Sequence, residues 1–114
     1  LQTLNPVPYR FCTLYSGSEG NAAYLETPSA RILIDAGRSL RALTQALDAA
    51  GGSMETVRAV FVTHEHADHT SALEMLAKKY DIPIHITEGS AARLLPKNTL
   101  SRIVPAKSTA FCVT

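Results

Sequence analysis

The 114-residue chain has no tryptophan, only two cysteines and almost no excess of charge of either sign. Cys12 and Cys112 stand far apart and form no CxxC pair, which excludes a metal or redox motif of that kind. Each lies in an apolar alternation, so we expect free, buried thiols. A formal net charge of +1 gives no basic surface of the kind that binds nucleic acid, so such a substrate would need positive charge from outside this chain.

Long apolar runs are also absent. No stretch approaches the length of a membrane span and no signal peptide is visible, so we expect no membrane partner and a cytoplasmic location. A hydrophobic fraction of 46% and a charged fraction of 18% are typical of a folded α/β chain. Without internal repeats, low-complexity segments or a long linker, the length fits one domain.

What the chain does contain is a cluster of three of its four histidines and one aspartate within residues 63–69, THEHADH. The cluster follows residues 57–62, an apolar run that predicts a buried strand. Side chains at such a strand end converge at the sheet edge, where open α/β sheets place their chemistry. Imidazole nitrogens and carboxylate oxygens are ligands of zinc and neighbouring transition metals, so the cluster predicts a metal site.

The spacing indicates how metals would be held. In an extended segment alternate side chains lean to one side, which would bring together His64, His66 and Asp68, while a turn into the next helix redirects His69. Two metals could each take two of these groups, and a water bridging them would lose a proton near neutral pH and become a nucleophile. Glu65 is expected to face solvent or to lie behind the ligands. The alternative is structural, with Asp68 as a helix N-cap and each histidine as a packed residue.

The HxHxDH pattern at residues 64–69, after an apolar strand, resembles the signature of the metallo-β-lactamase superfamily of metallohydrolases. Residues 31–37, RILIDAG, resemble the family's early strand, which ends in Asp and Gly. Residues 16–21, SGSEGN, resemble the hairpin loop of one bacterial branch, with phosphodiesterase or DNA exonuclease-like members. The resemblance covers residues 10–90, most of the chain.

This resemblance implies a ligand set for two zinc ions in the complete enzyme, with manganese as the alternative metal. His64 and His66 would bind one metal, and Asp68 and His69 would bind the second. Asp68 would also contact the attacking water, which makes it the expected catalytic residue.

The resemblance also implies roles outside the cluster. Asp35 would lie behind the ligands and orient a histidine by accepting its other ring proton. The alternative is a strand-end carboxylate that caps the turn at residues 35–37. Asn21 would lie near the substrate, although an asparagine beside Gly20 in a hairpin is first of all turn chemistry.

The family completes its site downstream with a third histidine, a bridging aspartate and a last histidine, and nothing in this chain matches them. The one other histidine, His85, lies in an apolar strand pattern and is expected to be packed rather than to bind metal. The chain begins without methionine and ends in a strand-like pattern. We therefore expect residues 1–114 to be a single incomplete domain, the N-terminal portion of an αββα sandwich. Its class would be α/β, with a mixed sheet and helices on the outer face.

The periodicity predicts strands separated first by turns and then by helices. The strands are expected at residues 11–15, 22–26, 32–34, 57–62, around 84, 100–104 and 110–113; the helices are expected from an N-cap at Ser39 to residue 50, and at 71–80 and 90–95.

We expect a metal-dependent hydrolase that uses a metal-bound hydroxide on a small-molecule ester or a phosphodiester. The favoured activity is that of a phosphodiesterase or nuclease, with nucleic acid among its substrates. One alternative is a thioester or lactone hydrolase of the same fold, like the glyoxalases. Another is a catalytically inert half-domain that acts as a binding module. The fragment alone is expected to be inactive, and an exposed sheet face would favour a homodimer.

Overall fold

The computed structural model describes residues 9–95 and 103–106. It contains one six-stranded sheet in the order β1-β2-β3-β4-β5-β6. The strands are β1 (Arg10–Tyr15), β2 (Ala22–Glu26), β3 (Arg31–Ile34), β4 (Ala59–Phe61), β5 (Ile84–Thr87) and β6 (Ile103–Ala106). The helices are α1 (Leu40–Ala49), α2 (Ala67–Thr70), α3 (Leu73–Tyr80) and α4 (Glu88–Leu94), with a 3-10 turn, η1 (Met54–Thr56), before β4.

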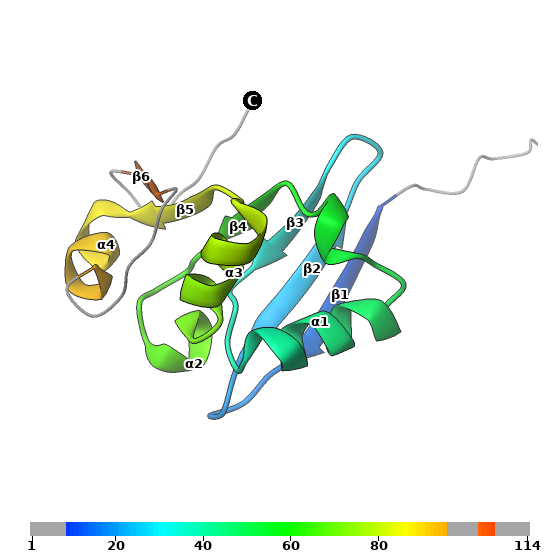
Figure 1. Ribbon diagram of the computed structural model, residues 1–114, viewed down its shortest axis with the longest axis horizontal. Coiled ribbons are helices and arrows are strands. Elements are labelled where there is room, and N and C mark those ends of the chain that lie inside the picture. Colours follow the sequence, from blue (N-terminus) through cyan, green and yellow to red (C-terminus); the bar gives the residue numbers. More distant parts are fainter. Residues whose placement is uncertain (1–8, 96–102, 107–114) are drawn as a thin grey trace, which may run out of the picture.

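The sheet is mixed, which confirms the predicted α/β class. Strands β1, β2 and β3 pair antiparallel, whereas β3, β4, β5 and β6 pair in parallel. Parallel neighbours need crossover connections, and these contain the helices. Helices α1 and α3 lie on the same side of the sheet (Figure 1). Because parallel strands end at the same edge, the segments that follow β3 and β4 meet there.

The core lies between this helical layer and one face of the sheet. Pairing places one residue of every strand in a single row: Cys12, Tyr24, Leu33, Val60, Ile84 and Ile103. The helices contribute fully buried leucines, namely Leu43, Leu47, Leu73 and Leu76. Burial of each such side chain stabilises the fold by about 1.5–3 kcal/mol, so the strand ends are held on a rigid support.

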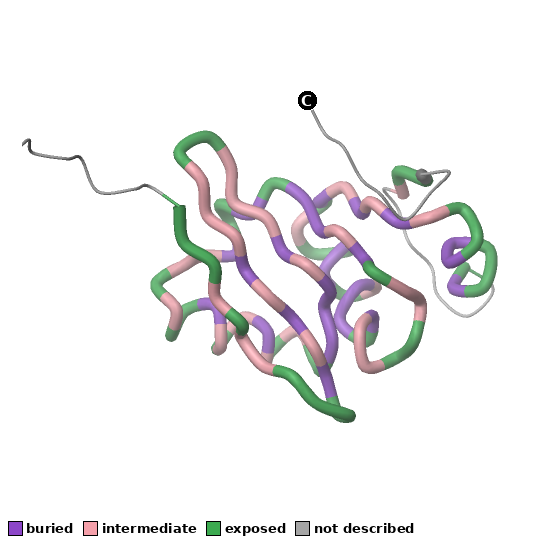
Figure 2. Tube along the Cα trace, turned by 180° about the vertical axis from the view of Figure 1, so that it is seen from behind, coloured by how far each residue is buried: buried purple, intermediate pink, exposed green. Residues whose placement is uncertain are grey.

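The other face of the sheet has no helical cover among the described residues (Figure 2). The register gathers a second, mostly apolar set there: Phe11, Leu25, Ile32, Ala23, Ile34, Phe61 and Val104. Phe11 is 61% exposed. His85 lies on this face and stacks on Phe61 with ring centroids 4.6 Å apart, as predicted for a packed strand histidine. Its burial lowers the pKa of His85.

The chain between the metal motif and β5 differs from the prediction of one helix at residues 71–80. Helix α2 begins at Ala67, and α3 starts anew at Leu73. The reason is that the carbonyls of Asp68 and His69 are bound by other backbone amides, those of Asn21 (2.7 Å) and Ala36 (2.8 Å). These carbonyls therefore do not serve the next turn of a continuous helix, and the helix breaks.

Other boundaries agree within one or two residues. Ser39 caps α1 as predicted, since its hydroxyl accepts a hydrogen bond from the amide of Ala42 at 3.1 Å. Strand β4 is shorter than the predicted 57–62. Of the predicted strand at 100–104, only residues 103 and 104 are described, and both lie in β6. The predicted strand at 110–113, and Cys112 with it, fall outside the described residues. None of the helices in the described ranges has both the length and the apolar character required to cross a membrane.

At the sheet edge opposite the metal motif, Glu26 links the first and third strands. Its carboxylate accepts hydrogen bonds from Nε of Arg10 (2.6 Å) and Nε of Arg31 (3.1 Å). The bond from Arg10 is the main reason why the pKa of Glu26 is lowered from 4.5. The ionised form of Glu26 is therefore favoured more in the folded chain than in the unfolded one.

We expect this carboxylate to make stability depend on pH. A lowered pKa in the folded state gives stability that is present above the ordinary value of 4.5 and is lost as the pH falls through the folded-state pKa. Urea unfolding of the wild type and of Glu26→Gln should differ at pH 7, and the difference should shrink steadily in acid. A difference that stays constant from pH 7 to strong acid would contradict this assignment.

Candidate metal centre

Three segments meet at the edge where β3 and β4 end. They are the β1–β2 hairpin at Asn21, the turn after β3, and the loop and short helix after β4. Backbone hydrogen bonds join them: the amide of Asn21 donates to Asp68 (2.7 Å), that of Ala36 to His69 (2.8 Å) and that of Gly37 to Asn21 (3.0 Å). Backbone hydrogen bonds therefore fix the positions of the three segments that carry the candidate ligands.

Three of the predicted ligands converge at this edge. Ligand atoms of His64, Asp68 and His69 all lie within 4.8 Å of one another, and all three residues are partly buried. The rings of His64 and His69 have centroids 3.9 Å apart. Nε2 of His69 lies 3.5 Å from Oδ2 of Asp68. Two ring nitrogens and a carboxylate oxygen at this spacing are a donor set that zinc or manganese accepts.

His66 stands slightly apart from these three. It is exposed and forms the N-cap of α2, and its ring meets that of His64 edge-on at 4.6 Å. The expected extended alternation through Asp68 is wrong, because the helix begins at Ala67. Asp68 reaches the site from the first helical turn, and the N-cap role considered for it belongs to His66.

Asp35 lies directly behind the cluster. It is 5% exposed and has a φ of 64°, a left-handed backbone that is uncommon for a residue with a Cβ. Its Oδ2 lies 2.7 Å from Nδ1 of His69, and its two oxygens accept the amide (2.8 Å) and the hydroxyl (2.7 Å) of Thr63. These contacts favour the predicted orienting role over capping of its own turn.

Thr63 is a site residue that the sequence interpretation missed. Its hydroxyl donates its one proton to Asp35, so the 3.0 Å contact with Nδ1 of His64 requires the ring to donate. Asp35 thus places a proton on Nδ1 of His69 directly and on Nδ1 of His64 through Thr63. In both rings Nε2 is then left with a free lone pair, as a metal ligand requires. The only signal in the sequence is a hydroxyl residue immediately before the first histidine.

Asn21 makes the predicted turn contacts and one more. Its side chain accepts from the amide of Gly17 (3.2 Å) and donates to the carbonyl of the same residue (2.9 Å). Its Nδ2 also donates to Oδ2 of Asp68 at 3.1 Å. Asn21 therefore ties the hairpin loop to the carboxylate of the cluster.

Glu65 is not one of the three converging ligands, as expected, but its carboxylate contacts α4 instead of facing solvent. Its Oε1 accepts from the hydroxyl of buried Ser90 at 2.9 Å, and Nη1 of Arg93 lies 3.4 Å from its carboxylate. A hydrogen bond from its own backbone, followed by that from Ser90, lowers the pKa of Glu65. This residue fastens the metal loop to α4.

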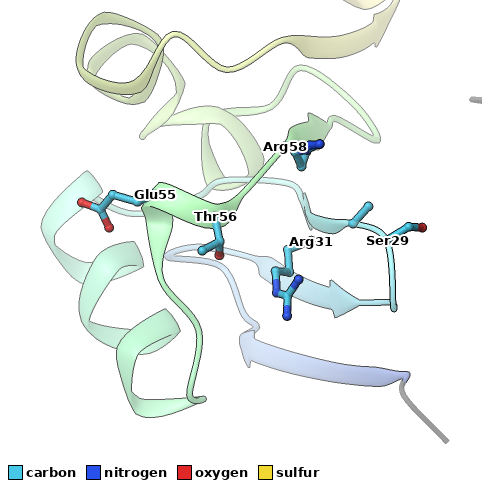
Figure 3. A pocket seen from close by; sticks show the side chains of 6 residues that line it. Ser29, Arg31, Glu55, Thr56 and Arg58 are labelled. Carbon is cyan, nitrogen blue, oxygen red and sulfur yellow. The ribbon is translucent and has the colours of Figure 1, made fainter.

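Two of the hollows lined by described residues lie near the ends of the strands. The larger, about 350 Å³, is at the edge opposite the histidines and is lined by Ser29, Ala30, Arg31, Glu55, Thr56 and Arg58 (Figure 3). The smaller, about 270 Å³, is bounded by the hairpin loop that Asn21 holds and by Arg38. Of these two, the smaller is linked to the cluster, because Asn21 bonds both Gly17 of its lining and Asp68.

Comparison with known proteins agrees with this geometry. A family model described as the metallo-beta-lactamase superfamily matches residues 16–102. The chain therefore belongs to the metallo-β-lactamase superfamily, which confirms the resemblance of the HxHxDH motif. The solved Rm3 metallo-beta-lactamase has the same fold, with a TM-score of 0.62 and 22% identity, over 85% of this chain and 42% of that one.

Two curated proteins that are more than 30% identical to this chain are named as exodeoxyribonucleases. The chain is similar to exodeoxyribonuclease YycJ of Bacillus anthracis, with 41% identity over 78 residues, which are 68% of this chain and 30% of that protein. It is also similar to exodeoxyribonuclease WalJ of Streptococcus pneumoniae serotype 2, with 35% identity over 85 residues, 75% of this chain and 32% of that protein. The chain thus spans about a third of the length of these relatives.

Proposed function

We propose that this chain forms part of a metal-dependent nuclease that degrades DNA from an end. The convergence of His64, Asp68 and His69 on one point, backed by Asp35, is the observation that carries the metal dependence. Membership of the superfamily and the names of the two exodeoxyribonuclease relatives support the choice of substrate. A DNA substrate agrees with the cytoplasmic location expected from the sequence.

The donor set fits the metal that the family implies. His64 and His66 would hold one zinc ion, with Asp68 and His69 at a second, and manganese is the alternative ion at both. When bound, the metal supplies an activated water and a positive charge that draws electrons from the reacting phosphate.

The chain's own residues prepare this chemistry. Asp35 and Thr63 keep protons on the far nitrogens of His69 and His64, so that the near nitrogens face the reaction. Asn21 fixes one carboxylate oxygen of Asp68 by a 3.1 Å hydrogen bond. The Asp68 carboxylate is then placed to accept a proton from the attacking water and to orient it.

We also propose that residues 1–114 are one portion of a single larger domain. Four candidate donor groups would be shared between two metals, and the relatives are about three times longer than the matched region. Further ligands would come from outside this chain. The isolated chain should therefore bind metal weakly and hydrolyse nothing.

His66→Ala tests the function in the natural polypeptide that contains these residues. We expect degradation of single-stranded DNA to fall by more than about 100-fold. Removal of a residue that only hydrogen-bonds a metal ligand lowers activity by about 10–100-fold, and removal of the ligand itself should have a larger effect. The far-ultraviolet circular dichroism should not change, since His66 is exposed and packs in no core. His85→Ala, which alters a histidine on the bare sheet face, is the matched control and should retain metal uptake.

Three results would overturn these assignments. Full turnover by His66→Ala would remove that residue from the metal site. Hydrolysis of a thioester reporter, with DNA left intact by the wild type, would favour the glyoxalase-like alternative, and absence of histidine-dependent metal uptake would favour an inert binding module.

A further inference from the structure

Arg38 is exposed, yet its side chain is held at both ends. A Cβ placed on Gly20 would lie 2.3 Å from Cγ of Arg38, so the arginine stem occupies the space that any other residue at position 20 would need. At the other end the guanidinium carbon lies 4.6 Å from the centroid of the Tyr15 ring, a cation–π contact. An arginine fixed in this way loses little conformational entropy when it binds a ligand.

The Tyr15 ring is itself fixed and uncharged. Its hydroxyl donates a hydrogen bond to the carbonyl of Gly37 at 2.6 Å. Burial raises the pKa of Tyr15 to about 12, so the ring remains neutral at any physiological pH. The guanidinium is thus stacked on a ring that a hydrogen bond holds to Gly37, in the turn after β3.

The backbone of Arg38 adopts the left-handed conformation, which is strained for a residue with a Cβ. Its φ is 61°, and the other non-glycine residues with positive φ in the described ranges are Asp35 and Asp81. Such a conformation costs free energy and persists where the surroundings require it, often at functional sites. Yet Arg38 forms no ion pair with any carboxylate among the described residues. The charge is positioned but not neutralised.

Arg38 lines the smaller hollow, next to the hairpin loop. The other lining residues are Ser16, Gly17, Ser18 and Glu19 of the hairpin loop. This loop is tied to the cluster through Asn21, which bonds both Gly17 and Asp68. Two hydroxyls and a fork of guanidinium N–H groups are donors that match the oxygens of a phosphate group.

We propose that Arg38, with the hydroxyls of Ser16 and Ser18, binds a phosphate of the DNA strand next to the phosphate that is cleaved. The inference rests on the proposed nuclease function and adds a substrate-binding residue to it. It also gives a chain with a net charge of +1 one fixed positive group for a polyanion, with further positive charge supplied from outside the chain. The carboxylate of Glu19 at the rim opposes the phosphate and limits the affinity.

Binding of a fluorescent single-stranded DNA oligonucleotide to the natural polypeptide, with EDTA present to prevent cleavage, tests this site. Arg38→Gln should weaken binding by at least about tenfold and lower the slope of log affinity against log salt by about 0.7, the value for one phosphate contact on a single strand. Glu19→Gln should tighten binding. The matched control is Arg58→Gln, an exposed arginine in the hollow at the opposite edge, which should leave affinity unchanged.

The results separate this inference from the function on which it rests. Equal affinity and salt slope for wild type and Arg38→Gln, in an enzyme that degrades DNA, would overturn the subsite alone. The same holds if Arg38→Gln and Arg58→Gln weaken binding equally. Failure of the wild type to degrade DNA with zinc or manganese present would overturn both. If Arg38→Gln does not fold, unchanged or weaker binding by Glu19→Gln still contradicts the proposal.

Discussion

Asp35→Ala is expected to lower the free energy of unfolding by about 3–5 kcal/mol, because each buried donor left without an acceptor costs about 1–3 kcal/mol. The carboxylate is 5% exposed and accepts hydrogen bonds from the amide and hydroxyl of Thr63 and from His69. Alanine would leave all three donors without an acceptor. The free energy of unfolding of a typical domain is about 5–15 kcal/mol, so this loss is a large part of it. Urea unfolding of the wild type and the variant would measure the difference.

Asp35→Asn separates the effect of Asp35 on the orientation of His69 from its effect on the stability of the fold. Asparagine tolerates the left-handed backbone and keeps one oxygen for the amide of Thr63, but its NH₂ cannot accept from His69. We expect a smaller loss of stability and a metal affinity reduced by about 10–100-fold. Nitrogen NMR of the His69 ring should show a changed tautomer. Wild-type metal affinity with an unchanged tautomer would show that Asp35 does not orient the ring.

Gly37→Ala should be nearly as damaging, for a steric reason. A Cβ at Gly37 would lie 2.1 Å from the carbonyl oxygen of Asp68 and 2.6 Å from the amide nitrogen of Asn21. Both atoms belong to backbone and to one hydrogen bond of 2.7 Å, so neither can move without opening the site. We expect a loss of about 3 kcal/mol, the upper end of overpacking effects, and loss of metal uptake and turnover.

Gly89→Ala is the matched control for this substitution. Gly89 lies in α4, and the nearest atom to its added Cβ is Nη1 of Arg93 at 3.9 Å. Alanine there should be neutral or should stabilise the chain by up to about 1 kcal/mol, because it is the better helix former. Thermal unfolding of both variants is the measurement. A Gly37→Ala variant as stable as Gly89→Ala would mean that the two segments do not pack as closely as described.

Local pattern was sufficient to predict most of the fold. The alternation in β1 and β2, the leucine stripe of α1 with its cap at Ser39, and the apolar run before His64 each depend on neighbours in the chain. The motif at residues 64–69 could be found for the same reason, since its members are adjacent in sequence. Family resemblance then supplied the roles of Asp35 and Asn21, which no periodicity reveals.

Contacts between distant segments could not be predicted in this way. The break before α3 results from amides about 30–50 residues upstream in the chain, which take the carbonyls of Asp68 and His69. The importance of Gly37 depends on the same close approach. Thr63 was missed because a threonine at a strand end has many uses, and only the positions of Asp35 and His64 assign one to it.

The left-handed backbone of Arg38, in the turn after β3, has a consequence for engineering. Glycine at position 38 would relieve this backbone strain, so a screen for heat tolerance would tend to select it. The exchange would remove the oriented guanidinium. Improvement of this protein by melting temperature alone would therefore erode the chemistry that the turn exists to support.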